Sequence, residues 1–362
     1  MNEQNIITFV SRIINQVMAN ERLEIIREYV KAHPQSSSTE IFEGTGQVAA
    51  YATVRRDLAR LVADGDLLVT GRGKASRYTL SPASELLRPV DINAYFALET
   101  DQRQIHEGYN FSLMDTLAAV PLLSWTEAEY LAALQAEFTA NVAGLSAAQY
   151  RKEMERLGID LSWKSSQIEG NTYSLLETER LLLEKETAAG KSKDEAVMLL
   201  NHKDALDFIL DAPDYMKVLT VAKIENIHSI LVKELEVDRN IRVRRVGITG
   251  TNYRPLDNEF QIREALEETC TLVNGRESVF EKALLILLLI SYIQPFNDGN
   301  KRTARIVSNA ILIASGYCPL SFRSVDSIDY KKAMLLFYEQ NSIAAFKRIF
   351  IEQFAFAVKT YF

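Results

Sequence analysis

The segment Gln294-Pro295-Phe296-Asn297-Asp298-Gly299-Asn300-Lys301-Arg302-Thr303-Ala304-Arg305 directly follows the most apolar stretch of the chain. That stretch, Val279–Ile293, is apolar on nearly every side, which predicts a buried central helix. The quoted segment predicts a loop that leads into a second helix, Lys301–Ser315. Backbone N–H groups at the start of a helix lack partners within it, and together with the helix dipole they favour an anion.

The residue types around this predicted helix start indicate a phosphate site. Gly299 and Asn300 tolerate a positive φ angle, so the backbone can curl into an anion-binding nest. Lys301, Arg302 and Arg305 bring three positive charges to a helix end that ordinarily prefers acidic side chains. We therefore predict that a polyphosphate binds here. The alternative is a basic helix start that faces only solvent.

This segment resembles the motif of the Fic family, His-x-Phe-x-Asp/Glu-Gly-Asn-Gly/Lys-Arg-x-x-Arg, at every specified position except the first. The resemblance covers roughly residues 91–362 and implies a mainly α-helical Fic domain with a short β-hairpin flap. Fic proteins typically transfer AMP from ATP to a hydroxyl group of a target protein, and self-modification is an expected reaction. Asp298 suits a Mg²⁺ ion held between phosphate oxygens, by its chemistry and by the resemblance.

The resemblance also assigns roles to the other motif residues. The phosphate-binding set comprises Gly299, Asn300, Lys301, Arg302 and Arg305. Candidates for the adenosine end of ATP are Tyr330 and Asn341. Lys301, where many relatives carry glycine, also occurs in the Doc-like branch that uses ATP as a kinase, so phosphoryl transfer remains open beside AMP transfer.

Three more segments resemble the family in order and spacing: Ile227-His228, Arg242–Asn258 and Gly316–Pro319. The middle one predicts a short hairpin or flap over Arg242–Glu259 and resembles the segment that holds a target side chain in line with the α-phosphate. His228 lies on a mostly apolar helix, and we expect it to be packed in the core.

An inhibitory element is indicated upstream of the motif. Ser165-Ser166-Gln167-Ile168-Glu169-Gly170 matches the family pattern Ser/Thr-x-x-x-Glu-Gly/Asn. Ser165 and Glu169 are four residues apart and so share one face of a helical turn. In the family, the glutamate pairs with the second motif arginine, here Arg305, and displaces the γ-phosphate. The alternative is a solvated helix end.

The one departure from the motif lies at its first position, where the family has a histidine and this chain has Gln294. The family histidine takes the proton from the attacking hydroxyl group. A carboxamide has no useful basicity, whereas an imidazole is well matched to neutral pH. Three explanations stay open: a natural pseudoenzyme, a transferase with another base, and a deliberate His-to-Gln inactivation. Loss of a general base typically costs about 10²–10⁴-fold in rate.

The N-terminal part differs in pattern from the rest. We expect a helix around Leu23–Val30, a short one from Ser38 to Phe42, a third over Ala49–Asp64, and strands over Leu67–Thr70 and Arg77–Leu80. This order is typical of a winged helix-turn-helix. The basic residues that would face DNA are Arg55, Arg56, Arg60, Arg72 and Lys74. A dimerisation module with a solvated basic face is the alternative.

We expect three parts: a winged-helix domain over residues 1–82, a helical linker region over 83–160, and a Fic domain that starts with the inhibitory helix over 161–362. Further helices are predicted over Trp125–Val142, Ala147–Leu157, Leu175–Ala188, Lys193–Asp211, Thr220–Glu234, Gln261–Asn274, Asp329–Tyr338 and Ile343–Thr360.

Composition fits an ordinary globular protein of 362 residues, with 47% apolar and 25% charged residues. No stretch reaches the roughly 20 apolar residues of a membrane span, and we predict no secretory signal. Cys270 and Cys318 are too few for a disulfide framework, so a reducing cytoplasm is the expected location. The partners that we expect are ATP, a target protein or the chain itself, and DNA through residues 1–82, with a homodimer as a further option. The competing functions are a nucleotide-sensing DNA-binding regulator and an interaction scaffold.

Overall fold

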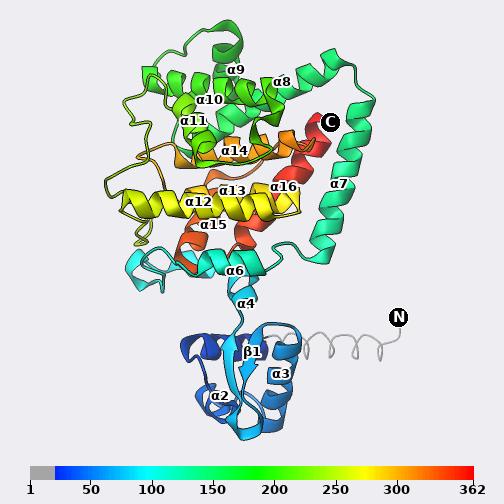
Figure 1. The fold of residues 1–362 in the computed structure, drawn as a ribbon, viewed down its shortest axis with the longest axis vertical. Helices are drawn as coiled ribbons and strands as arrows, with labels where there is room; N and C mark the ends of the chain where they lie inside the picture. The colour runs from blue at the N-terminus through cyan, green and yellow to red at the C-terminus, as the bar shows by residue number, and fades with distance from the viewer. Residues whose placement is uncertain (1–20) are drawn as a thin grey trace, which may run out of the picture. The chain divides into compact units, whose positions relative to one another are not determined.

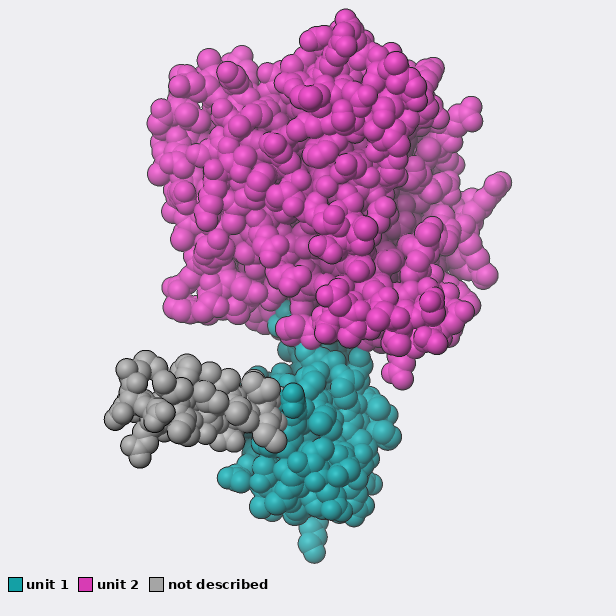
Figure 2. Space-filling model, turned by 180° about the vertical axis from the view of Figure 1, so that it is seen from behind, with its two compact units in different colours: residues 1–88 teal, residues 89–362 magenta. Residues whose placement is uncertain are grey.

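The computed structural model describes residues 21–362, and they divide into two compact units at Arg88 and Pro89 (Figure 2). The structure is mostly helical with one two-stranded antiparallel sheet, as the sequence predicts. Part of the predicted winged-helix domain, residues 1–20, lies outside the described residues. Among the described helices, none is long and apolar enough to span a membrane.

The smaller unit has a helix over residues 21–32, then α2 (Ser38–Gly44), α3 (Tyr51–Ala63), β1 (Leu67–Thr70), the 3₁₀ turn η1 (Gly73–Ala75), β2 (Arg77–Leu80) and α4 (Pro82–Leu87). The two strands have the bounds expected from the sequence. Their pairing places Leu67 opposite Leu80, and both lie in an apolar core with Leu58 and Leu61 of α3. The element order is the one on which the winged-helix prediction rests.

The larger unit is almost entirely helical. Its α-helices are α5 (Ile92–Ala97), α6 (Leu113–Ala119), α7 (Trp125–Ala143), α8 (Ala147–Ile168), α9 (Leu175–Glu184), α10 (Lys193–Asp211), α11 (Val221–Leu231), α12 (Glu259–Gly275), α13 (Val279–Ile293), α14 (Asn300–Ala314), α15 (Ser327–Gln340) and α16 (Ala344–Tyr361). Two 3₁₀ turns, η2 (Thr100–Gln102) and η3 (Pro213–Met216), complete the unit.

Helix α13 is the centre of the larger unit (Figure 1). All of its residues from Phe280 to Ile293 except Lys282 are buried. It packs against α12, α14 and α15, while α10 packs against α8, α9, α11 and α14. A helix that is apolar all round needs neighbours on every side, and this arrangement supplies them. The loop after α13 therefore follows directly from a buried, closely packed helix.

Several predicted boundaries were wrong. Helix α8 does not stop at Leu157 but runs on to Ile168, because its face against α10 stays buried beyond Gly158. Helix α9 ends at Glu184 rather than Ala188, because Lys185 adopts a left-handed conformation with φ 62°. The segment Arg242–Glu259, predicted as a short hairpin or flap, contains no paired strands. Arg254 instead makes an isolated parallel bridge with Gly108, and α12 begins at Glu259.

Candidate functional site

The motif loop connects two left-handed residues. Gln294 caps the C-terminus of α13 with φ 51° and ψ 59°, and Gly299 caps the N-terminus of α14 with φ 79° and ψ 3°. Of the two residues that tolerate a positive φ, Gly299 adopts one and Asn300 is the first residue of α14. Within the described chain, no side chain caps the start of α14. Its first backbone N–H groups therefore have no side-chain partner, an arrangement that favours an anion.

Asn300 holds the loop from inside with its buried side chain. Its Oδ1 accepts a hydrogen bond of 2.8 Å from the Phe296 backbone nitrogen, and its Nδ2 donates to the Phe296 carbonyl at 2.8 Å. Nδ2 also donates to Oε1 of Gln294 at 3.0 Å, while Nε2 of Gln294 donates to the Ser291 carbonyl at 2.6 Å. Asn300 therefore offers a phosphate only its backbone, and both ends of the Gln294 amide are engaged.

A buried arginine fixes the same loop from the side of the flap. The guanidinium of Arg242 is 1% exposed and has no carboxylate partner among the described residues. It donates to four backbone carbonyl oxygens, those of Arg244, Leu256, Ile293 and Gln294. The charge lies at the C-terminus of α13, where the helix dipole favours a cation. The partners of Arg242 are backbone carbonyl groups, which no sequence motif identifies, and the sequence analysis did not predict this role.

The first motif arginine and the predicted metal ligand form an ion pair. NH2 of Arg302 donates to Oδ2 of Asp298 at 2.8 Å, four residues earlier. The Asp298 side chain is 63% exposed, whereas that of Arg302 is 1% exposed. No atom of the described residues accepts a hydrogen bond from Nε or NH1 of Arg302. These two nitrogens are therefore available to an acceptor from outside the chain.

The second motif arginine meets the end of α8, as the sequence pattern suggests. Nε of Arg305 donates to Ser165 Oγ at 2.8 Å, and NH2 donates to the Ser165 carbonyl at 3.0 Å and to Oε1 of Glu169 at 2.7 Å. The other carboxylate oxygen of Glu169 accepts from Lys301 Nζ at 3.2 Å. Gly170 follows with φ 102°, a conformation that favours glycine. Glu169 thus forms ion pairs with two of the three cationic residues predicted to bind phosphate, Lys301 and Arg305.

The charge of Glu169 is strongly stabilised in this position. Burial of the carboxyl group opposes ionisation, but the charges of Arg305 and Lys301 outweigh it and lower the pKa of Glu169 to about 2. Glu169 is therefore an anion at every physiological pH. A carboxylate held in this way mimics the negative charge of a phosphate group in front of the same cations.

His228 lies behind the loop rather than in it. Its ring is fully buried and stacks on Phe296, with ring centroids 3.7 Å apart and the planes 3° from parallel. Nε2 of His228 lies 3.0 Å from the Asp298 carbonyl oxygen. Burial of the ring, which outweighs its hydrogen bonds to the backbone carbonyl groups of Asp298 and Arg239, lowers the pKa of His228. This histidine packs and positions the loop, in agreement with its expected place in the core.

The two residues considered for the adenosine end are both buried. Tyr330 is 0% exposed, and the guanidinium carbon of Arg305 lies 5.3 Å from the centre of its ring. Asn341 is also buried; it donates to the Phe337 carbonyl and accepts from Asn110. Neither side chain lies open to a nucleoside in this structure. Tyr330 instead stabilises the guanidinium group of Arg305 through a cation–π contact.

In the smaller unit, the predicted DNA-facing residues are all exposed on α3 and on the turn between the strands. These residues are Arg55, Arg56, Arg60, Arg72 and Lys74. Arg60 pairs with Asp64 at 3.4 Å, and Arg56 donates to Thr53 at 3.2 Å. By contrast, Arg22 and Arg27 are held by the acidic residues Asp57 and Asp66. Of the five predicted DNA-facing residues, only Arg60 forms an ion pair with an acidic residue among the described residues of this unit.

Comparison with known proteins identifies the family to which the larger unit is similar. Residues 218–312 match the Fic/DOC family. Protein adenylyltransferase Fic of Nematostella vectensis is 29% identical over 182 residues, which cover 46% of this chain and 40% of that protein. Protein adenylyltransferase fic-1 of Caenorhabditis elegans is 26% identical over 160 residues, 42% of this chain and 31% of that protein. The chain thus matches less than half the length of these relatives.

Solved structures give the same result for the fold. Fic-1 from C. elegans has a TM-score of 0.58 at 20% identity, over 69% of this chain and 80% of that chain. A Fic domain containing signaling protein from Bacteroides thetaiotaomicron has a TM-score of 0.53 at 20% identity, over 64% of this chain and 96% of that chain. Together with the match over residues 218–312, these likenesses show that the larger unit carries a region similar to the Fic/DOC family and has the Fic fold.

Proposed function

We propose that this chain binds ATP with Mg²⁺ at the start of α14, that Glu169 inhibits this binding, and that the chain derives from an adenylyltransferase that transfers AMP to hydroxyl groups of proteins. The contact of Glu169 with both Arg305 and Lys301 carries the proposal. The Glu169 carboxylate takes up hydrogen-bond donors of Arg305 and Lys301 that a γ-phosphate would also need. The adenylyltransferase activity is suggested by the names of the relatives.

The residues present fit a magnesium ion held together with a nucleotide. Asp298 offers an exposed carboxylate next to a helix start without a side-chain cap. Mg²⁺ is usually bound by one or two carboxylates, phosphate oxygens and water rather than by a cage of protein ligands. No group of three or more metal-ligating side chains occurs among the described residues. Asp298 would hold the ion, which would neutralise phosphate charge, and Arg302 would then be free to contact the phosphates.

Transfer of AMP requires a proton acceptor as well as a nucleotide. The target oxygen attacks the α-phosphorus, pyrophosphate leaves, and the hydroxyl proton must pass to a base. Gln294 occupies the position of the family base, and its amide is hydrogen-bonded to Asn300 and Ser291. We infer that nucleotide binding survives in this chain and that transfer is slow or absent. Whether the residual reaction moves AMP or a phosphoryl group is decided by comparing α-labelled with γ-labelled ATP.

Isothermal titration calorimetry with ATP and Mg²⁺ tests the binding site. We expect weak binding by the unmodified chain and about tenfold tighter binding by Glu169→Gly, because Arg305 then regains a charge-assisted partner in the phosphate. Arg305→Ala should lose the gain. Glu184→Gly is the matched control, since Glu184 also lies at a helix end and pairs with an arginine. Equal affinities of Glu169→Gly and the unmodified chain would contradict the proposal.

A DNA-binding regulator is the second candidate, favoured by the exposed basic residues of α3. Arg55 and Arg56 are both exposed on this helix, the element that enters the major groove in helix-turn-helix proteins. In this reading the larger unit senses nucleotide and the smaller unit binds DNA. The overall charge of −7 argues that only a local patch would contact the phosphates.

A gel-shift titration at several salt concentrations tests this second function. We expect Arg55→Ala with Arg56→Ala to weaken DNA binding and to flatten the salt dependence, because each lost phosphate contact reduces the slope by about one. Arg348→Ala is the control, because Arg348 is an exposed arginine of the larger unit. Absence of any shift by the unmodified chain at low salt would rule out the DNA-binding function.

A further inference from the structure

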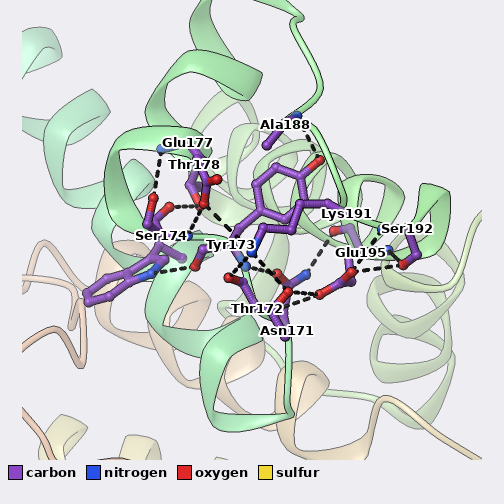
Figure 3. A network of polar contacts seen from close by, with 11 residues as sticks. Asn171, Thr172, Tyr173, Ser174, Glu177, Thr178, Ala188, Lys191, Ser192 and Glu195 are labelled. Carbon is purple, nitrogen blue, oxygen red and sulfur yellow. Dashed lines mark hydrogen bonds and ion pairs between the residues drawn. The ribbon is translucent and has the colours of Figure 1, made fainter.

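The loop that follows Glu169 is tied to the start of α10 by one carboxylate (Figure 3). Oε1 of Glu195 accepts from the Thr172 backbone nitrogen at 2.8 Å and from the Thr172 hydroxyl at 2.6 Å. Its other oxygen, Oε2, accepts from the backbone nitrogen and hydroxyl of Ser192, each at 3.0 Å, and so closes the capping box of α10. One side chain thus serves both a helix cap and a loop.

Two neighbouring residues strengthen this connection between Thr172 and Glu195, which we call the tie. Nδ2 of Asn171 donates to the Glu195 carbonyl at 2.8 Å. Nζ of Lys191 donates to the Thr172 carbonyl at 2.6 Å and to its hydroxyl oxygen at 3.1 Å (Figure 3). The hydrogen bond from the Thr172 hydroxyl is the largest single cause that lowers the pKa of Glu195, which lies at about 2. The tie is therefore charge-assisted over the whole physiological pH range.

The tie lies close to the inhibitory residue along the chain. Only Gly170 and Asn171 separate Glu169 from Thr172, and the backbone nitrogen of Asn171 donates to the Ser166 carbonyl at 3.0 Å. The end of α8, the loop and the start of α10 are thus connected by hydrogen bonds without a gap. Capping boxes with the same Ser-x-x-Glu spacing begin α7 and α9, but their glutamates accept from the N-cap residues Ser124 and Ser174 and not from Thr172.

We propose that Glu195, through Thr172, is a positioning residue for Glu169 and sets the strength of the inhibition. This inference rests on the proposed function, since it assumes that Glu169 competes with the γ-phosphate. When ATP displaces Glu169, the end of α8 and the loop have to move together, and the Thr172–Glu195 contacts are lost. The tie therefore stabilises only the inhibited state, and its loss shifts the population toward the state that binds nucleotide.

Two reciprocal variants separate this role from a general effect on α10. Thr172→Val removes the hydroxyl contact with Glu195 and leaves the capping box, whereas Ser192→Ala removes the cap hydroxyl and leaves the tie. We expect Thr172→Val to tighten Mg²⁺-ATP binding about fivefold in calorimetry, the effect of about one hydrogen bond lost at an exposed residue. Ser192→Ala should lower the melting temperature without changing the ATP affinity. Equal affinity changes in both variants would overturn the proposal.

A double-mutant cycle links the effect to Glu169. In the Glu169→Gly background, Thr172→Val and Glu195→Ala should leave the ATP affinity unchanged, because the inhibition that they weaken is already absent. The same fivefold gain in that background would show a merely structural effect and would overturn the proposal.

Hydrogen exchange without nucleotide provides a readout that does not depend on ATP. Residues 166–172 should exchange faster in Thr172→Val than in Ser192→Ala. If Glu169→Gly itself fails to change the ATP affinity, the proposed function fails, and faster exchange in Thr172→Val alone still shows that the tie holds the end of α8. Unchanged exchange together with unchanged affinity, while Glu169→Gly binds more tightly, would overturn the positioning role of Glu195.

Discussion

The side chains of Asn300 and Gln294 are joined by a hydrogen bond of 3.0 Å that spans the motif loop, from the amide nitrogen of Asn300 to the amide oxygen of Gln294. Both residues are buried. Because Asn300 also bonds both backbone polar groups of Phe296, the amide pair fixes the two ends of the loop relative to each other. The motif therefore keeps a rigid shape although its first residue has no basicity.

Replacement of Asn300 should loosen the loop that holds Gly299, one of the residues proposed to bind phosphate. For Asn300→Ala we expect a loss of about 1–3 kcal/mol in the free energy of unfolding, because buried amide groups lose their partners. The Kd for Mg²⁺-ATP should rise as well. Urea denaturation and calorimetry measure the two effects. Asn297→Ala is the control, since Asn297 is exposed in the same loop; an equal loss in both variants would show that Asn300 has no special role.

Inhibition by Glu169 should not depend on pH near neutrality. The pKa of Glu169 falls from an ordinary value of 4.5 to about 2, so its ionic contacts stabilise the inhibited state fully above pH 4.5 and are lost only as the pH falls toward 2. The ratio of ATP affinities between Glu169→Gly and the unmodified chain should therefore be constant from about pH 6 to about pH 8. A ratio that approaches one at pH 6 would show that Glu169 takes up a proton there.

Arg242 should be needed for the rigidity of the flap. Arg242→Lys keeps the charge but cannot reach four carbonyl oxygens with one ammonium group, so we expect a loss of about 3 kcal/mol in stability and faster hydrogen exchange over residues 242–257. Arg245→Lys, at an exposed flap position paired with Asp257, should stay within about 0.5 kcal/mol. Similar stability of the two variants would contradict the role of Arg242.

The sequence predicted the parts of the fold that depend on local pattern. The apolar helix α13 and the strands β1 and β2 have the predicted bounds, because periodicity and turn residues specify them directly. The left-handed Gly299 follows from the same local chemistry. What the sequence did not predict depends on contacts between distant residues. The segment Arg242–Glu259 contains no paired strands, and Arg254 pairs with the distant Gly108 instead. No motif predicts the carbonyl partners of Arg242, and the capping box of Glu195 predicts Ser192 but not Thr172.

The decisive prediction concerns the combination of Gln294→His with Glu169→Gly. Imidazole at position 294 supplies the acceptor for the hydroxyl proton, and removal of Glu169 frees Arg305 and Lys301 for the phosphates; AMP transfer needs both in the same turnover. After incubation with ATP and Mg²⁺, intact-mass spectrometry should show AMP on the double variant, with a rate about 10²–10⁴-fold above Glu169→Gly alone. Gln294→His alone should give little product, because Glu169 is still paired with Arg305 and Lys301. Strong AMP addition by Glu169→Gly alone would show that another residue is the base. A double variant that folds and binds ATP but transfers nothing would favour a nucleotide sensor over a transferase.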